Sequence, residues 1–100
     1  MKCVIYLQIV TKNVTRSHNG FLGVERLSGK STEEQNYLSL ESLEDEAEDA
    51  TIFPSKIGAI TRMQRMCTDY CNIEYAEVME YDENDFSAHP IEDTPNFIKK

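Results

Sequence analysis

Two cysteines, Cys67 and Cys71, lie four residues apart, a spacing that places both side chains on one face of a helix. Thiolates at that spacing can bind a metal ion, but a structural zinc site takes four ligands, usually as two short-spaced pairs. The other candidates, Cys3, His18 and His89, are scattered along the chain. The sequence therefore predicts no metal and no cofactor, and we expect the thiols to pack in the interior.

The segment Gly29-Lys30-Ser31-Thr32 matches the end of a phosphate-binding loop. That motif also needs a glycine five positions before Gly29, where this chain has Val24. It needs an amphipathic helix after the loop, but Glu33-Glu34-Gln35 begins no apolar stripe. We therefore expect no nucleotide site.

Nucleophilic catalysis requires a base beside a serine or cysteine, and neither histidine lies near a thiol in the sequence. A catalytic pair of carboxylates requires a pocket that shifts the pKa of one of them, which a solvated run of charges does not supply. We therefore expect that the protein is not an enzyme.

Carboxylates dominate the charge of the chain, with 18 acidic against 10 basic residues and a net charge of -8. This balance argues against direct binding to nucleic acid or to an anionic membrane, because both are held by Lys and Arg. It is compatible with a basic protein partner. The candidate partner-binding residues are Glu41, Glu44, Asp45, Glu46, Glu48, Asp49, Glu77, Glu80, Asp82 and Phe86.

The acidic run from 41 to 49 has three interpretations. It can be a solvated loop, a docking surface for a basic groove, or a mimic of a nucleic-acid backbone. Mimicry requires a regularly spaced track of carboxylates, and it would also use Glu74, Glu77, Glu80, Asp82, Glu83 and Asp85.

The pattern of apolar residues predicts strands at 2–12, 21–27, 37–40 and 73–81, and a helix from about Lys56 to Tyr70. Asn19-Gly20 predicts a hairpin turn at 17–20, and residues 28–36 and 41–49 are expected to be loops. The order β-β-β-α-β predicts an α+β fold. We expect a single, mostly antiparallel sheet with one amphipathic helix packed on one face.

The helix is expected to begin at Ser55, whose hydroxyl can cap an early amide. Its apolar stripe is expected to contain Ile57, Ile60, Met63, Cys67 and Tyr70. Asn72 is expected to end it.

One hundred residues are expected to form a single domain at 1–82, followed by an extended tail at 83–100. The tail segment from Phe86 to Ile91 can fray, fold back over the sheet edge, or act as a strand that binds a partner. Three cysteines and the absence of a signal peptide predict a reducing cytosol.

The segment from Tyr37 to Tyr81 resembles a pattern found in small uncharacterised bacteriophage accessory proteins. In that pattern a tyrosine strand leads through a charged loop to Asp-Ala-x-x-Phe, a Ser or Thr cap and a helix beginning with alanine. Asp49-Ala50, Phe53, Ser55 and Ala59 match it, although the Trp that often precedes the loop is absent.

The resemblance implies a phage-like origin and a sheet-plus-helix fold. It does not itself imply an activity. Small acidic phage proteins of this kind often resemble inhibitors of host enzymes or of host defence, so we expect a cytoplasmic inhibitor that covers a functional surface of a host protein concerned with defence or with nucleic-acid processing. The alternative is a module that binds or sequesters a small ligand, as an oligomer with pockets between subunits. Tyr6, Tyr37 and Tyr75 would then line the pocket.

Overall fold

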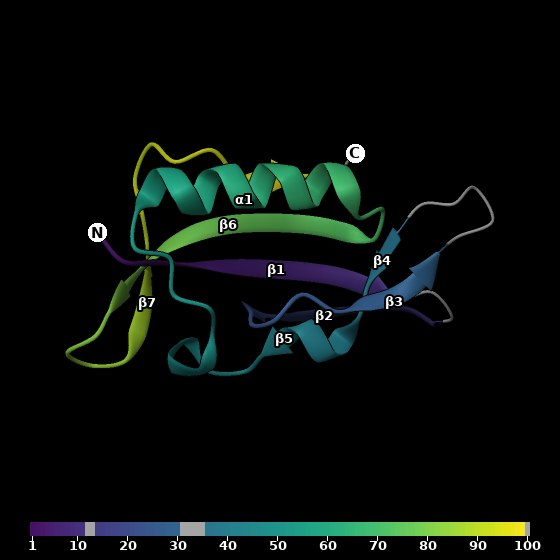
Figure 1. Ribbon diagram of the computed structural model, residues 1–100, viewed down its shortest axis with the longest axis horizontal. Coiled ribbons are helices and arrows are strands. Elements are labelled where there is room, and N and C mark those ends of the chain that lie inside the picture. Colours follow the sequence, from purple (N-terminus) through teal and green to yellow (C-terminus); the bar gives the residue numbers. More distant parts are fainter. Residues whose placement is uncertain (12–13, 31–35, 100) are drawn as a thin grey trace.

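Two long antiparallel strands, β1 (Cys3–Thr11) and β6 (Ile73–Asp82), form the middle of the main sheet in the computed structural model (Figure 1). The structure describes residues 1–11, 14–30 and 36–99. The main sheet has the order β5-β2-β1-β6-β7, with β2 at Val14–Leu22, β5 at Leu43–Glu44 and β7 at Ser87–Pro90. A further short strand, β8 (Phe97–Ile98), pairs with the start of β6.

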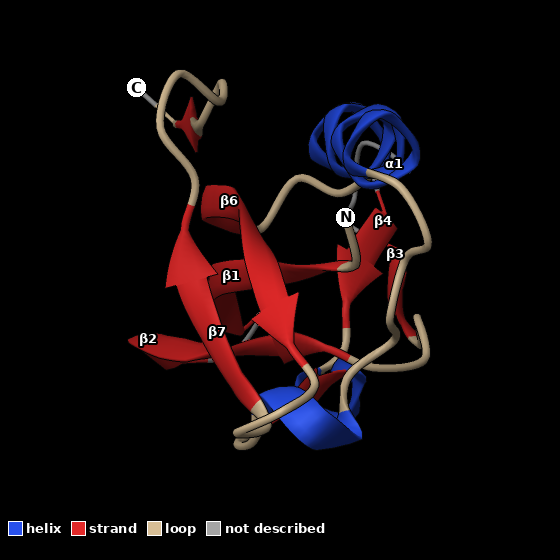
Figure 2. Ribbon diagram, turned by 90° about the vertical axis from the view of Figure 1, so that its left-hand side faces the viewer, coloured by secondary structure: helices blue, strands red, loops and turns tan. Residues whose placement is uncertain are grey.

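The helix α1 (Lys56–Asp69) lies against one face of β1 and β6, which confirms the predicted α+β class (Figures 1 and 2). As predicted, the Ser55 hydroxyl caps it, accepting a hydrogen bond from the Gly58 amide at 3.1 Å. A bilayer-spanning helix needs about 20 apolar residues, and none of the helices in the described residues reaches that length and apolarity.

The core lies between α1 and alternate residues of the central strands. Ala59, Met63 and Met66 of the helix pack with a set of buried strand residues: Cys3, Ile5, Leu7, Ile9, Ala76 and Val78. The predicted stripe is wrong at Ile57, which is 77% exposed. It precedes Met63 by six residues and so lies about 120° around the helix from Met63, and still farther from Ala59 and Met66.

The predicted turn at 17–20 is wrong, because these residues lie inside β2. Gly20 pairs with Leu7, and a Cβ on Gly20 would lie 2.9 Å from the Cβ of Leu43. The glycine therefore allows β5 to approach β2, and this tertiary requirement outweighs the turn preference of Asn-Gly. β1 and β2 connect through residues 12–13, which lie outside the described residues.

The two predicted loops contain regular structure. Part of the first is β3 (Leu27–Lys30), which pairs with β4 (Asn36–Leu38) in a separate two-stranded sheet. The rest of that loop and of the phosphate-loop match, residues 31–35, lies outside the described residues. The acidic run contains two short 3-10 helices, η1 (Leu40–Ser42) and η2 (Ala47–Asp49), on either side of β5. Ser42 and Ala47 are buried, and they hold this segment against the fold.

The last residues of the chain also join the sheet. β7 pairs with the end of β6, from Met79↔Pro90 to Asp82↔Ser87, and β8 pairs with its start through Tyr75↔Ile98. The segment expected as a tail thus folds back onto the sheet edge.

Asn72, expected to stop the helix, is a buried connector between elements. Its side-chain oxygen accepts a hydrogen bond from the Leu38 amide at 2.8 Å. Its side-chain nitrogen donates to the carbonyls of Val10 at 2.8 Å and Leu38 at 2.9 Å, and its own carbonyl accepts from the Val10 amide at 3.0 Å. One side chain therefore joins β1, β4 and the start of β6.

Replacing Asn72 with Ala should destabilise the fold by about 3 kcal/mol, because several buried backbone groups lose their partners. Urea unfolding followed by circular dichroism measures the change. Asn96→Ala removes an exposed amide and is the matched control, with an expected change below about 0.5 kcal/mol. Equal effects in the two variants would contradict the role assigned to Asn72.

Candidate functional site

Acidic residues from two distant segments meet at one end of the sheet. The loop between β6 and β7 lies beside η2 in the end-on view of Figure 2, and β7 contacts η2. Desolvation raises the pKa of Tyr81, the carboxylates of Glu48, Glu83 and Asp49 raise it further, and Lys2 opposes them. These carboxylates therefore lie near enough to interact with one hydroxyl. We call Glu48, Asp49, Asp82, Glu83 and Asp85 the acidic end.

An ion pair with a lysine offsets part of this charge. The Lys2 ammonium lies 2.7 Å from a carboxylate oxygen of Glu83, and both side chains are more than half exposed. An exposed pair of this kind contributes roughly 0–1 kcal/mol to stability. Since four carboxylates of the acidic end lie outside this pair, the surface remains strongly negative.

Phe86 lies in the hairpin loop directly after Asp85 and has unusual geometry. Its φ is 58°, a left-handed conformation that is costly for an aromatic residue, and the residue is 58% exposed. Asn or Gly would adopt the same backbone with less strain. The fold thus displays an apolar ring beside carboxylates at the cost of local backbone strain.

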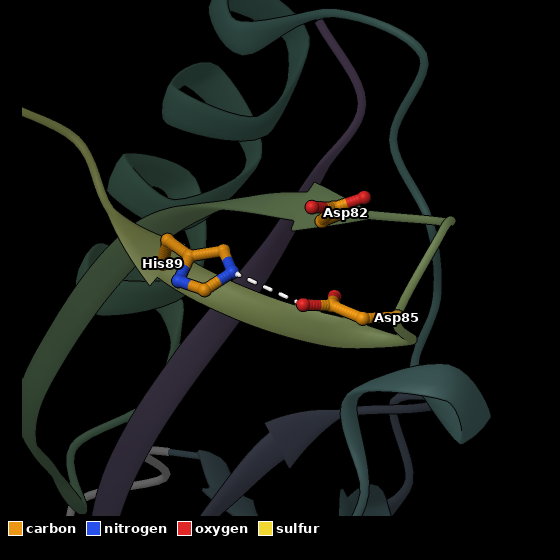
Figure 3. Close-up of side chains that lie close together, drawn as sticks. All are labelled: Asp82, Asp85 and His89. Atoms are coloured by element: carbon orange, nitrogen blue, oxygen red, sulfur yellow. Dashed lines mark ion pairs between the residues drawn. The ribbon is translucent and has the colours of Figure 1, made fainter.

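Figure 3 shows Asp82, Asp85 and His89 close together on this hairpin, with one potential metal-ligating atom of each within 4.8 Å of the others. Their polar atoms already have protein partners. Asp82 accepts from the Asn84 amide at 2.9 Å, and Asp85 accepts from the amide and hydroxyl of Ser87. The cluster is therefore explained by hydrogen bonds that stabilise the hairpin loop. It offers three ligands to a cation, one fewer than a structural zinc site uses.

Ser87, His89 and Asp85 have the residue types of a catalytic triad but a different geometry. The Ser87 hydroxyl lies 2.8 Å from His89 Nε2, while Asp85 approaches that same nitrogen at 4.0 Å. In a triad the carboxylate holds the other imidazole nitrogen. The serine also donates its proton to Asp85, so His89 is not placed to receive it.

The other predicted partner-binding residues are spread over several surfaces. Glu44 in β5 and Glu77 in β6 are partly exposed on the main sheet, and Glu80 is exposed opposite His89. Glu41 lies in η1, and Asp45 and Glu46 are exposed before η2. The acidic run is therefore distributed over η1, β5 and η2.

The structure also brings in residues that the sequence analysis did not select. Lys2 and Tyr81 lie beside the acidic end, yet nothing in their local sequence marks them. Tyr37 lies in β4 of the small sheet, so it is not grouped with Tyr6 and Tyr75 of the main sheet.

The thiols are separate from this site. Burial raises the pKa of Cys67 to about 11, which keeps it protonated at neutral pH. Cys71 donates to the Asn36 carbonyl at 3.3 Å, and Cys3 is buried. Within the described part of the chain, no cysteine belongs to a group of three potential metal-ligating side chains.

Comparison with protein-family models, curated proteins and solved structures finds no match to this chain.

Asp85 should stabilise the hairpin in a pH-dependent manner. The Ser87 hydroxyl lowers the pKa of Asp85 below 3.8, helped by the Ser87 amide and His89 and opposed by desolvation. Because the folded-state pKa is the lower one, this stabilisation is complete above the unfolded-state pKa of about 3.9 and is lost as pH falls through the folded value.

Urea unfolding of wild type and Asp85→Asn between pH 6 and pH 2.5 measures this contribution. The stability difference should be present at pH 6 and shrink below about pH 4. Asp45→Asn, an exposed aspartate without such bonds among the described residues, is the control. A difference that does not vary with pH would refute the assignment.

Proposed function

We propose that the protein binds a basic surface of a partner protein through the acidic end, with Phe86 as its apolar anchor. The observation that carries this proposal is the exposed ring of Phe86 in a strained conformation beside the carboxylates of two distant segments. Backbone strain of this kind costs about 1–3 kcal/mol and is concentrated at functional sites.

The two components of this surface have different physical roles. Carboxylates around an interface speed association with a basic partner and select its orientation. An aromatic ring buried on binding supplies much of the affinity, since a few such residues usually dominate an interface. Phe86 stands on a β-hairpin braced by Asp85 and Ser87, so little further ordering is needed for it to dock.

We further propose that the partner is a host protein and that binding inhibits it by covering a basic functional surface. The supporting observations are the net charge of -8 and the phage-like pattern at 37–81. Within that pattern Ser55 caps α1, and Phe53 pairs with Cys3 through two backbone hydrogen bonds of 2.8 and 2.9 Å. These two pattern residues support the fold, and Asp49 of the same pattern belongs to the acidic end.

The test is an affinity pull-down from bacterial lysate at about 50 mM and 500 mM salt, read by mass spectrometry. Wild type should recover one protein in near-equal amount at low salt. High salt should release it, because the Debye length then falls to a few ångströms and attraction between exposed charges is largely screened. Phe86→Gly, and separately Glu48→Gln/Asp49→Asn/Glu83→Gln, should each reduce recovery at least about tenfold.

The matched control removes three carboxylates elsewhere, as Glu41→Gln/Glu92→Gln/Asp93→Asn, and should retain the partner. If both triple variants lose the partner equally, only the overall charge matters and the assigned surface is wrong. If wild type recovers no protein at either salt, the proposal fails for that host. Ligand sequestration then becomes the stronger alternative.

A further inference from the structure

The sheet face turned away from α1 carries a row of side chains that crosses four strands. Ile5, Leu7, Ala76 and Val78 pack on the helix side, so their neighbours in the strands point to the opposite face. There the pairing register places Glu44 opposite Phe21, Phe21 opposite Tyr6, and Tyr6 opposite Glu77. From β5 to β6 the row therefore consists of a carboxylate, two aromatic rings and a second carboxylate.

The residues of this row are partly exposed and arranged by defined contacts. The rings of Tyr6 and Phe21 meet edge to face with centroids 5.4 Å apart. Glu77 accepts a hydrogen bond from the Tyr75 hydroxyl at 3.0 Å, which fixes one carboxylate oxygen and leaves the other available. The Glu44 side chain lies over Gly23, and within the described residues it has no hydrogen-bond or ion-pair partner.

The charge on this face is one-sided. The positions of β1, β2 and β6 that alternate onto it contain no Lys or Arg: Val4, Tyr6, Gln8, Val10, Ser17, Asn19, Phe21, Tyr75, Glu77, Met79 and Tyr81. The nearby Lys99 points elsewhere, because its ammonium donates to the Cys71 carbonyl. Lys2 interacts with Tyr81 at one end of this face, where it pairs with Glu83. Within the described residues, the two carboxylates on either side of the aromatic rings have no ion-pair partner.

We propose that this face binds an extended, arginine-bearing segment of a partner protein. A guanidinium group stacks flat on an aromatic ring and donates two parallel hydrogen bonds to a carboxylate from its planar fork, whereas a lysine ammonium is a compact point charge without that fork. From Glu44 to Glu77 the row covers three inter-strand steps, about 14 Å, and an extended chain covers that distance in about four residues. Arginines at positions i and i+4 share a side and can each reach one carboxylate.

This surface differs from the acidic end and extends the proposed function, because a partner wrapped around the molecule could engage both. The two surfaces have no residue in common. They can therefore be tested and can fail separately.

The experiment is an NMR titration of isotope-labelled protein with acetyl-Arg-Gly-Ser-Gly-Arg-amide, and with the same peptide carrying lysines. The arginine peptide should shift resonances of Tyr6, Phe21 and Glu77 and bind about fivefold or more tighter than the lysine peptide. A dilution series without peptide tests whether a second copy covers this face instead. Shifts of these same resonances on dilution would overturn the proposal.

Two double variants with equal charge loss separate this surface from general electrostatics. Glu44→Gln/Glu77→Gln should weaken the arginine peptide about tenfold, whereas Glu48→Gln/Asp49→Asn should change it less than about twofold. Unchanged spectra outside the row confirm that each variant folds. Equal weakening in the two variants, equal affinity for both peptides, or a footprint on the acidic end would each overturn the proposal.

Discussion

The hydrogen bonds of the buried Asn72 amide connect parts of the fold that hydrophobic packing alone does not fix. The main sheet and α1 share a continuous core to which β4 contributes only Leu38, and β4 itself belongs to a separate small sheet. The Asn72 side chain bonds both backbone groups of Leu38 and the Val10 carbonyl, which holds β4 against the end of β1. A buried amide with all these groups satisfied specifies one arrangement of the strands, because any shift leaves polar atoms unpaired.

Fixing the central strands also determines both candidate surfaces. β6 runs antiparallel to β1 along most of its length, so its far end forms a hairpin with β7 beside η2. The same register places Glu77 opposite Tyr6 on the face away from α1. One pairing therefore gathers carboxylates from distant segments at the acidic end and aligns the aromatic row across the sheet.

Local patterns predicted α1, its Ser55 cap and the α+β class, since helical periodicity and capping depend on residues close together in the sequence. These patterns gave wrong predictions where contacts between strands distant in the sequence determine the structure. Gly20 meets β5 instead of forming a turn, and Asn72 forms hydrogen bonds with two strands, β1 and β4, instead of ending a helix. The approach of Glu48 to Glu83 and the row from Glu44 to Glu77 depend on strand register, which alternation in a single strand does not reveal.

The central functional claim is that Phe86 is held in a strained conformation for what it displays rather than for folding. The most direct measurement is the free energy of unfolding of Phe86→Gly against wild type, in urea at neutral pH. Glycine relieves the left-handed strain, so the account predicts a gain of about 0.5–1 kcal/mol in stability. A variant that is less stable than wild type would show that the ring stabilises the hairpin, and would contradict the claim.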